Sequence, residues 1–320
     1  ADLMRWPTSF RDLVEGRAFR GAGQQVRLEA VPGNQVSRYT FIFRQPYLFD
    51  TRVQFSGSAY YFQRFYNDWR EERTGGRVGL GYQLAHIPDL SFNGALRVEN
   101  VDIRNPAVPT PASLAKVVGD SQLYVAEFAA VHDTRDNPFL ATQGHRLSLG
   151  FDLGFGEFDF PRGTIDGRQH FLLGERPDGS GRQVLTLSSQ VGCSGAATPI
   201  YENYFAGGFS SLRGFNFRGV GPRDLNVNVG GTFQWLNTVE YMFPLTADDM
   251  IRGVFFCDFG TVERRIEMHA DNFRVAPGFG LRITVPAMGP APIAIDFAVP
   301  VAHAPGDDIQ NVAFYVGFGR

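Results

Sequence analysis

The strongest candidates for acid–base chemistry lie in residues 133–138, which read DTRDNP. Asp133 and Asp136 flank Arg135, and paired carboxylates beside a cation can move protons on a bound substrate. His132 precedes the segment, but no nucleophile accompanies it. The same residues are typical of a tight turn, because Asp and Asn side chains hydrogen-bond nearby backbone groups. We therefore interpret the segment as a turn, and we expect that the chain is not an enzyme.

The six histidines and two cysteines could bind a metal only if their spacing brought them together. The histidines contain no i, i+4 pair and no HExxH motif, and the cysteines form no CxxC motif. We expect no metal site and no cofactor. We expect Cys193 and Cys257 to be buried, reduced packing residues. Gly306–Asp308 lacks the spacing of an EF-hand, and we interpret it as a surface loop.

The longest candidate loop, Ser194–Gly230, contains an arginine motif, because residues 207–215 read GGFSSLRGF. A loop of this length costs entropy to hold in one place unless something tethers it. Arg213 could tether it through charge-assisted, bidentate hydrogen bonds to carboxylates. Gly214 would let the backbone turn beside the arginine, and Phe215 would pack against the wall. From these residues alone, an exposed loop with a solvated Arg213 is the favoured alternative.

Apolar residues alternate with small or polar ones along most of the chain, and this pattern predicts strands around these residues. No long amphipathic helix competes with this pattern, and the predicted fold class is all-β. The pattern predicts fourteen strands: Gln24–Val31, Arg38–Gln45, Thr51–Arg64, Gly75–Leu84, Leu90–Ile103, Ser121–Asp133, Gly144–Phe155, Ile165–Glu175, Gln183–Cys193, Gly231–Phe243, Ile251–Val262, Phe273–Val285, Pro292–Pro300 and Asn311–Gly319.

The second face of these strands decides between a soluble sandwich and a membrane barrel. It carries many Gly, Ser and Thr residues, and charges recur in mid-strand, among them Glu240, Asp258, Arg282 and Asp296. The strands are about ten residues long, which fits a tilted span of a bilayer. Aromatic residues cluster near strand ends, and short turns alternate with long loops. We interpret the chain as a transmembrane antiparallel β-barrel whose apolar face contacts lipid.

Composition excludes several other classes of protein. Hydrophobic residues make up 43% of the chain, which excludes a disordered protein. No window of about 18 consecutive apolar residues is present, so we expect no transmembrane helix. The formal net charge of -3 gives no electrostatic basis for binding nucleic acid.

Five ordered motifs together resemble the barrel domain of BamA-type outer-membrane protein assembly factors, the bacterial surface antigen family. The resemblance covers about residues 17–320. The loop motif resembles the sixth loop of the family, and residues 133–138, leading to 142–144, resemble its mid-barrel turn. Residues 237–244 and 255–262 resemble the two strands after the loop, and residues 278–282 and 289–290 precede a final strand at 312–318.

The resemblance implies a sixteen-stranded barrel, with a long loop folded into its lumen and periplasmic POTRA domains before it. This chain shows about fourteen strands and no POTRA-like segment. Five strands follow the arginine loop, as in the family. We therefore expect the strands that are missing relative to sixteen to be the first ones, at the N-terminus. Residues 1–23 would be a lead-in that holds a remnant of the first barrel strands. Residues 24–320 would form the outer-membrane barrel, with residues 194–230 as the lumen-inserted loop.

The resemblance and side-chain parity together indicate the site residues. Parity places Glu240 and Asp258 on the polar face of adjacent strands, where the resemblance places the partners of the loop arginine. We expect the Arg213 guanidinium within about 4 Å of at least one of these carboxylates. Glycines near the C-terminus weaken strand pairing, so the last strand could peel from its neighbour at a seam. The loop-motif tether is Leu212, Arg213, Gly214 and Phe215, and the C-terminal seam strand is marked by Phe314, Val316, Gly317 and Phe318.

The resemblance implies a function in the cell outer membrane, as a multi-pass β-barrel. The chain would be the barrel domain of an assembly factor that catalyses the folding and insertion of other β-barrel proteins, with no covalent bond broken. Its expected partners are nascent outer-membrane β-barrel proteins, the lipid bilayer, and periplasmic accessory lipoproteins or chaperones, but no nucleic acid. Two alternatives stay open, namely a two-partner-secretion-type polypeptide transporter and a passive porin.

Overall fold

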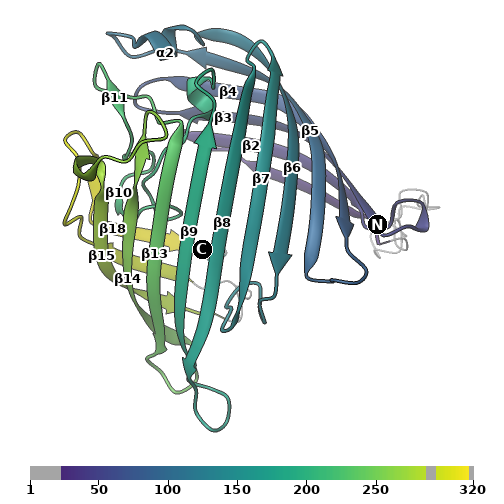
Figure 1. The fold of residues 1–320 in the computed structure, drawn as a ribbon, viewed down its shortest axis with the longest axis vertical. Coiled ribbons are helices and arrows are strands. Elements are labelled where there is room, and N and C mark those ends of the chain that lie inside the picture. The colour runs from purple at the N-terminus through teal and green to yellow at the C-terminus, as the bar shows by residue number, and fades with distance from the viewer. Residues whose placement is uncertain (1–22, 286–292, 317–320) are drawn as a thin grey trace. The chain divides into compact units, whose positions relative to one another are not determined.

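The computed structural model describes residues 23–285 and 293–316 (Figure 1). None of the helices in these two ranges has the length and apolar character needed to cross a membrane. The described chain consists mainly of strands, and this confirms the predicted all-β class. Its helical turns are short: η1 (Leu48–Asp50), α2 (Ala112–Ala115), η2 (Ile200–Glu202) and η3 (Ala270–Asn272).

In the described part of the chain, fourteen strands form one sheet, and neighbouring strands of the sheet follow the order of the chain. This is the number that the alternation of apolar residues predicts. Strands β1 (Gln25–Val31) and β18 (Val312–Val316) are the two ends of the order. Between them come β2 (Val36–Gln45), β3 (Val53–Phe65), β4 (Arg70–Gln83), β5 (Leu90–Arg104), β6 (Gly119–Asp133), β7 (Gly144–Gly156), β8 (Phe160–Gly174), β9 (Gln183–Ser194), β13 (Phe233–Pro244), β14 (Ile251–Glu263), β15 (Arg274–Ile283) and β16 (Ile293–Ala298).

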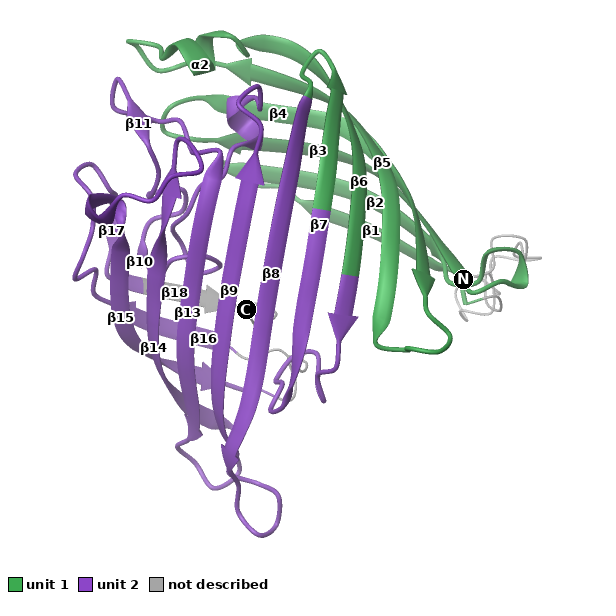
Figure 2. Cartoon of the chain, in the orientation of Figure 1, with its two compact units in different colours: residues 1–130, 151–159 green, residues 131–150, 160–320 purple. Residues whose placement is uncertain are grey.

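The chain divides into two compact units, which Figure 2 shows in green and purple. Unit 1 comprises residues 1–130 and 151–159, and it holds β1 to β5, most of β6 and the end of β7. Its strands carry buried ion pairs on the polar face. Glu71 accepts from Arg73 at 2.7 Å, and Glu99 accepts from Arg97 at 3.0 Å and from Arg73 at 3.3 Å. These pairs neutralise carboxylates that the sheet removes from water.

Unit 2 comprises residues 131–150 and 160–320, and it contains the arginine loop. β13 and β14 each pair with a strand on both sides. Within the described residues β18 is the last strand of the sheet and pairs with β16. Since one ladder holds β18, its backbone makes fewer ladder hydrogen bonds than a strand inside the sheet.

The two faces of the strands have the character that the barrel interpretation predicts. Apolar side chains such as Leu149, Phe151 and Phe279 are exposed, whereas Asp258 and Arg282 on the opposite face are buried. A soluble sandwich would bury the apolar face and expose the charges. Exposed apolar side chains on period-two positions are what a bilayer requires of strands that cross it.

Two predicted strand boundaries are wrong in the same direction. β4 begins at Arg70 rather than Gly75, and β8 begins at Phe160 rather than Ile165. The first residues of β4 are charged or polar, so they carry no apolar alternation. They join the ladder because cross-strand partners exist for them, with Arg70 opposite Arg104 of β5.

The prediction that both cysteines are buried is also wrong. Cys193 is exposed and Cys257 is half-buried, and neither forms a disulfide. Cys257 shares its face of β14 with the exposed Phe255, and Cys193 shares its face of β9 with the exposed Leu187. A small apolar residue on the lipid-facing side of a strand does not need a protein core to cover it.

Candidate functional site

The loop that connects β9 to β13 packs onto the polar face of the strands of unit 2. It is ordered by short elements of its own, namely η2, β10 (Gly214–Phe215), β11 (Arg223–Asp224) and β12 (Val227–Asn228). Apolar side chains of the loop form a buried cluster with polar-face residues of β13, β14 and β15. The cluster consists of Tyr204, Ala206, Leu212, Phe215, Val220, Leu236, Val262 and Ala276.

A compact turn presents the arginine. The Ser211 hydroxyl accepts a hydrogen bond from Gly207 N–H and donates one to Gly207 O, both at 2.9 Å. Gly214 has φ of 92°, in the left-handed region that favours glycine. A Cβ at Gly214 would lie 3.1 Å from Pro300 Cγ and 3.3 Å from Ala276 Cβ. Glycine therefore lets the loop lie against β15 and the segment after β16.

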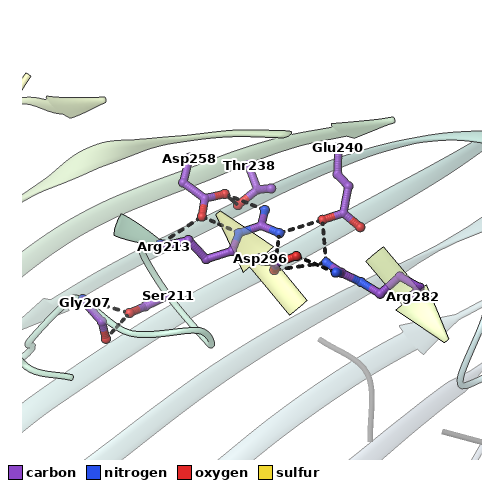
Figure 3. Close-up of polar contacts among 8 residues, drawn as sticks. All are labelled: Gly207, Ser211, Arg213, Thr238, Glu240, Asp258, Arg282 and Asp296. Carbon is purple, nitrogen blue, oxygen red and sulfur yellow. Dashed lines mark hydrogen bonds and ion pairs between the residues drawn. The ribbon is translucent and has the colours of Figure 1, made fainter. Parts of the chain in front are cut away.

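Arg213 is 1% exposed and reaches three carboxylates (Figure 3). Its Nε and Nη2 donate to the two oxygens of Asp258 at 2.8 and 2.9 Å. Its Nη1 donates to Glu240 at 2.9 Å and to Asp296 at 3.2 Å. The guanidinium carbon lies 3.3 Å from the centroid of the Phe256 ring, which adds a cation–π contact.

The carboxylates around Arg213 are held by further donors. Thr238 donates from its hydroxyl to Asp258 Oδ1 at 2.8 Å, and the backbone N–H of Arg213 donates to Asp258 Oδ2 at 3.0 Å. Arg282 of β15 donates to both oxygens of Asp296 and lies 3.7 Å from Glu240. These contacts join two arginines to three carboxylates.

Burial decides how much this cluster contributes to stability. A fully buried ion pair gains little over a well-packed apolar pair, but removing one partner leaves an uncompensated charge. Such a loss costs about 3–5 kcal/mol. Asp258 and Asp296 are fully buried, whereas Glu240 is partly exposed. The buried carboxylates therefore fix the position of the loop more strongly than Glu240 does.

The structure brings the predicted residues of the loop and its partners together. The expected separation of about 4 Å between Arg213 and a carboxylate is met by both Glu240 and Asp258. The alternative of a solvated Arg213 is wrong. Leu212 and Phe215 are buried beside it.

Sequence reasoning missed Asp296 and Arg282 as members of the cluster. Both are charges in mid-strand, and side-chain parity places each on the polar face. That parity is the signal in the sequence that could have found them. The register that sets Arg282 near Asp296, and the reach of the loop to β16, come from the fold.

The predicted seam residues are only partly described. Phe314 and Val316 belong to β18, where the backbone pairs with β16 in the register Ile295 opposite Phe314 and Ile293 opposite Val316. Gly317 and Phe318 lie outside the described residues, as do residues 1–22 of the predicted lead-in.

The interpretation of Gly306–Asp308 as a solvated surface loop is wrong for Asp307. Its carboxylate accepts from Arg274 of β15 at 2.9 and 3.0 Å, and both side chains are buried. The reason lies in the loop motif, because the neighbouring Asp308 carbonyl accepts from Asn216 N–H at 2.8 Å. The arginine loop thus holds this segment against the sheet.

The turn interpretation of residues 133–138 agrees with the structure. The Asp136 carboxylate accepts from Thr142, from its backbone N–H at 2.8 Å and its hydroxyl at 2.5 Å. Asn137 Oδ1 accepts from Phe139 N–H at 2.8 Å, and Arg135 donates to Asp133 at 2.8 and 2.9 Å. These groups bond one another and shape the connection from β6 to β7.

A histidine pair at the base of this turn was not predicted. His132 Nδ1 lies 2.8 Å from His145 Nε2, and the rings stack with centroids 4.9 Å apart. The turn between their strands brings the two residues together. They are thirteen residues apart in the chain, so an i, i+4 spacing does not describe this pair. Within the described ranges, no three His, Cys, Asp or Glu side chains form a group that could hold a metal ion.

Comparison with known proteins gives a consistent family relationship. The Omp85 superfamily domain matches residues 18–319. The chain is 23% identical over 329 residues to the outer membrane protein assembly factor BamA of Neorickettsia risticii. That alignment covers 94% of this chain and 41% of the relative, so the chain spans less than half the length of the relative.

Solved structures show the same fold. The crystal structure of BamA from Haemophilus ducreyi lacking POTRA domains 1-3 matches with a TM-score of 0.76 at 17% identity, over 92% of this chain and 64% of that one. CdiB from Acinetobacter baumannii matches with a TM-score of 0.59 at 12% identity, over 87% of this chain and 48% of that one. The fold is therefore a transmembrane antiparallel β-barrel, and its likeness is greater to BamA.

Proposed function

The chain belongs to the Omp85 superfamily, and on that premise we propose that it is the barrel domain of an outer-membrane protein assembly factor. Its activity would be to accelerate the folding and insertion of other β-barrel proteins into the outer membrane. The likeness to BamA along nearly the whole chain supports this proposal. The exposed apolar side chains of the strands would contact the acyl chains, and the polar face would line the lumen.

The observation that carries the proposal is the C-terminal edge of the sheet. Within the described residues β18 is the last strand of the sheet, and β16 is its one strand neighbour. An edge strand offers backbone N–H and C=O groups to an incoming strand, which can add to the sheet by β-augmentation. Unpaired backbone groups are costly in lipid, so pairing with the incoming strand is favoured at the moment of insertion.

The arginine loop would keep the lumenal side of this edge in a defined conformation. Arg213 binds Glu240 of β13, Asp258 of β14 and Asp296 of β16. The loop therefore spans the strands next to the edge. An arginine suits this role because its planar, permanently charged guanidinium can satisfy several carboxylates at once.

The partners follow from this activity. The clients would be nascent outer-membrane β-barrel proteins, delivered unfolded from the periplasmic side. Accessory lipoproteins or chaperones would hold them there before insertion. A non-covalent activity of this kind requires neither a nucleophile nor a cofactor.

A reconstitution experiment tests the proposal. The chain is inserted into lipid vesicles, an unfolded β-barrel client is added, and the heat-resistant folded client is followed on gels over time. We expect the client to fold at least about tenfold faster than in vesicles with an unrelated barrel. Arg213→Glu should insert but lose most of the acceleration. Equal rates with this chain and with the unrelated barrel would contradict the proposal.

The same vesicles distinguish the two alternatives. A polypeptide transporter would move an unfolded substrate into the vesicle lumen without inserting it in the membrane, which protease protection detects. A passive porin would give a steady ion conductance and no effect on client folding. The CdiB likeness is one of fold and leaves the transporter as the second candidate to be tested in this way.

A further inference from the structure

The arginine loop is hydrogen-bonded to the segment that leads into the terminal strand. β10 pairs antiparallel with β17 (Ile309–Gln310), so that Phe215 lies opposite Ile309. The pairing continues beyond these residues, because Asn216 N–H donates to Asp308 O at 2.8 Å. Asn311 is the single residue between β17 and β18, and its carbonyl accepts from Ala298 N–H at 2.9 Å. The loop thus contacts the chain directly before β18.

A second link runs from Arg213 to β16, the strand that pairs with β18. Asp296 of β16 accepts from Arg213 at 3.2 Å and from Arg282 at 3.1 Å. In the register of the sheet, Asp296 lies opposite Ala313 of β18 on one side and Gly280 of β15 on the other. A Cβ at Gly280 would lie 1.9 Å from Asp296 Oδ1. The space for this carboxylate therefore exists because residue 280 has no side chain.

Holding the loop does not by itself explain these contacts. Asp258 already pairs with Arg213 in a bidentate manner, and Glu240 adds a further hydrogen bond. A third buried carboxylate adds the desolvation cost of a further charge. Asp296 differs from the other two in its place, because its strand is the neighbour of β18.

We infer that Asp296 and the β10–β17 pair are positioning groups that hold the terminal strand β18 in register. Seating of the arginine loop and pairing of the C-terminal edge are then one coupled event. When Arg213 leaves its carboxylates and β10 leaves β17, the ladder with β16 is the one pairing that the described part of β18 retains, and the edge frays. This inference deepens the proposed function, because the frayed edge is the one that would receive a client strand.

Amide hydrogen exchange of the full chain in lipid nanodiscs tests the coupling. We expect Asp296→Asn to speed exchange in residues 293–298 and 309–316 by about tenfold, because local opening becomes easier. Glu240→Gln is the matched control, since it also removes a carboxylate partner of Arg213 but lies on β13. It should change exchange at the edge by less than about twofold. Equal changes in the two variants would overturn the inference.

A rescue experiment guards against a general loss of structure. All variants carry serine in place of Cys193 and Cys257, and in this background Arg213→Gln should speed exchange at the edge. Asn216→Cys and Asp308→Cys place a disulfide where the Asn216 N–H donates to the Asp308 carbonyl. This disulfide should restore slow exchange in the Arg213→Gln chain. Failure of the closed disulfide to restore it would overturn the inference.

Exchange and client folding are separate readouts, so failure of one idea can be told from failure of the other. Coupled exchange without any acceleration of client folding would leave the inference intact and reject the proposed function. Accelerated client folding without coupled exchange would support the proposed function and reject the inference.

Discussion

Single residues around Arg213 contribute unequally to stability, because their burial and bonding differ. Asp258 is fully buried and accepts three hydrogen bonds from Arg213, whereas Glu240 is partly exposed and accepts one. We expect Asp258→Asn to lower the free energy of unfolding by about 3–5 kcal/mol, because it weakens three charge-assisted hydrogen bonds from a buried residue. Glu240→Gln should lower it by about 1–2 kcal/mol. Chemical unfolding in detergent measures both, and an equal cost for the two variants would contradict this ranking.

Gly214 offers a second prediction at this scale, with a matched control elsewhere in the chain. Gly214 and Gly119 have φ of 92° and 97°, so alanine at either position pays a similar strain of about 1–2 kcal/mol. A Cβ at Gly119 meets nothing within 4 Å, whereas one at Gly214 meets Pro300 and Ala276. Gly214→Ala should therefore lower the thermal midpoint clearly more than Gly119→Ala does. Equal midpoints would show that the close approach of the loop to β15 is not needed.

At the scale of elements, the connection from β6 to β7 should be sensitive to acid. Burial raises the pKa of Asp136, but hydrogen bonds from Thr142 and from the N–H of Gln143 outweigh it and leave the pKa below its usual value. Because the folded pKa is depressed, this stabilisation is present above the unfolded pKa of about 3.9 and is lost as pH falls through the folded pKa.

Limited proteolysis with pepsin measures this effect at the bond between Phe139 and Leu140. At pH 5 the wild-type turn should be cleaved more slowly than the Asp136→Asn turn, and at pH 2 the two rates should converge. Comparing the two chains at each pH cancels the pH dependence of the protease. A rate ratio that is the same at both pH values would contradict the role of the carboxylate.

The strands could be predicted from the sequence because each one carries its own signal. Alternating apolar residues report which face of a strand meets lipid, and this is a local property of residues such as those of β7. Parity alone was sufficient to place Glu240 and Asp258 on the same face. The β10–β17 pair could not be predicted in this way, because two-residue strands have no period, and their partners lie far apart in the chain. The burial of Asp307 was missed for the same reason.

For the molecule as a whole, two equally exposed side chains should have different surroundings, namely lipid on one face of the barrel wall and water on the other. Phe279 on β15 is 54% exposed and Phe217 in the arginine loop is 50% exposed. We expect the fluorescence of Phe279→Trp to be quenched by lipids with brominated acyl chains, and that of Phe217→Trp to be quenched by aqueous iodide instead. Quenching of Phe217→Trp by the lipids would contradict the seating of the loop on the polar face.

The C-terminal edge of the sheet should receive the strands of a client. Site-specific cross-linking during assembly can detect this contact, with one cysteine at Val312 of β18 or, as the control, at Phe171 of β8, both of which are exposed. Each chain lacks the native cysteines and is reconstituted in vesicles with a client that carries one cysteine in its last strand. We predict a transient disulfide between the client and Val312→Cys, and none with Phe171→Cys. Equal cross-linking at both positions, or none at Val312→Cys while the client folds, would contradict the account.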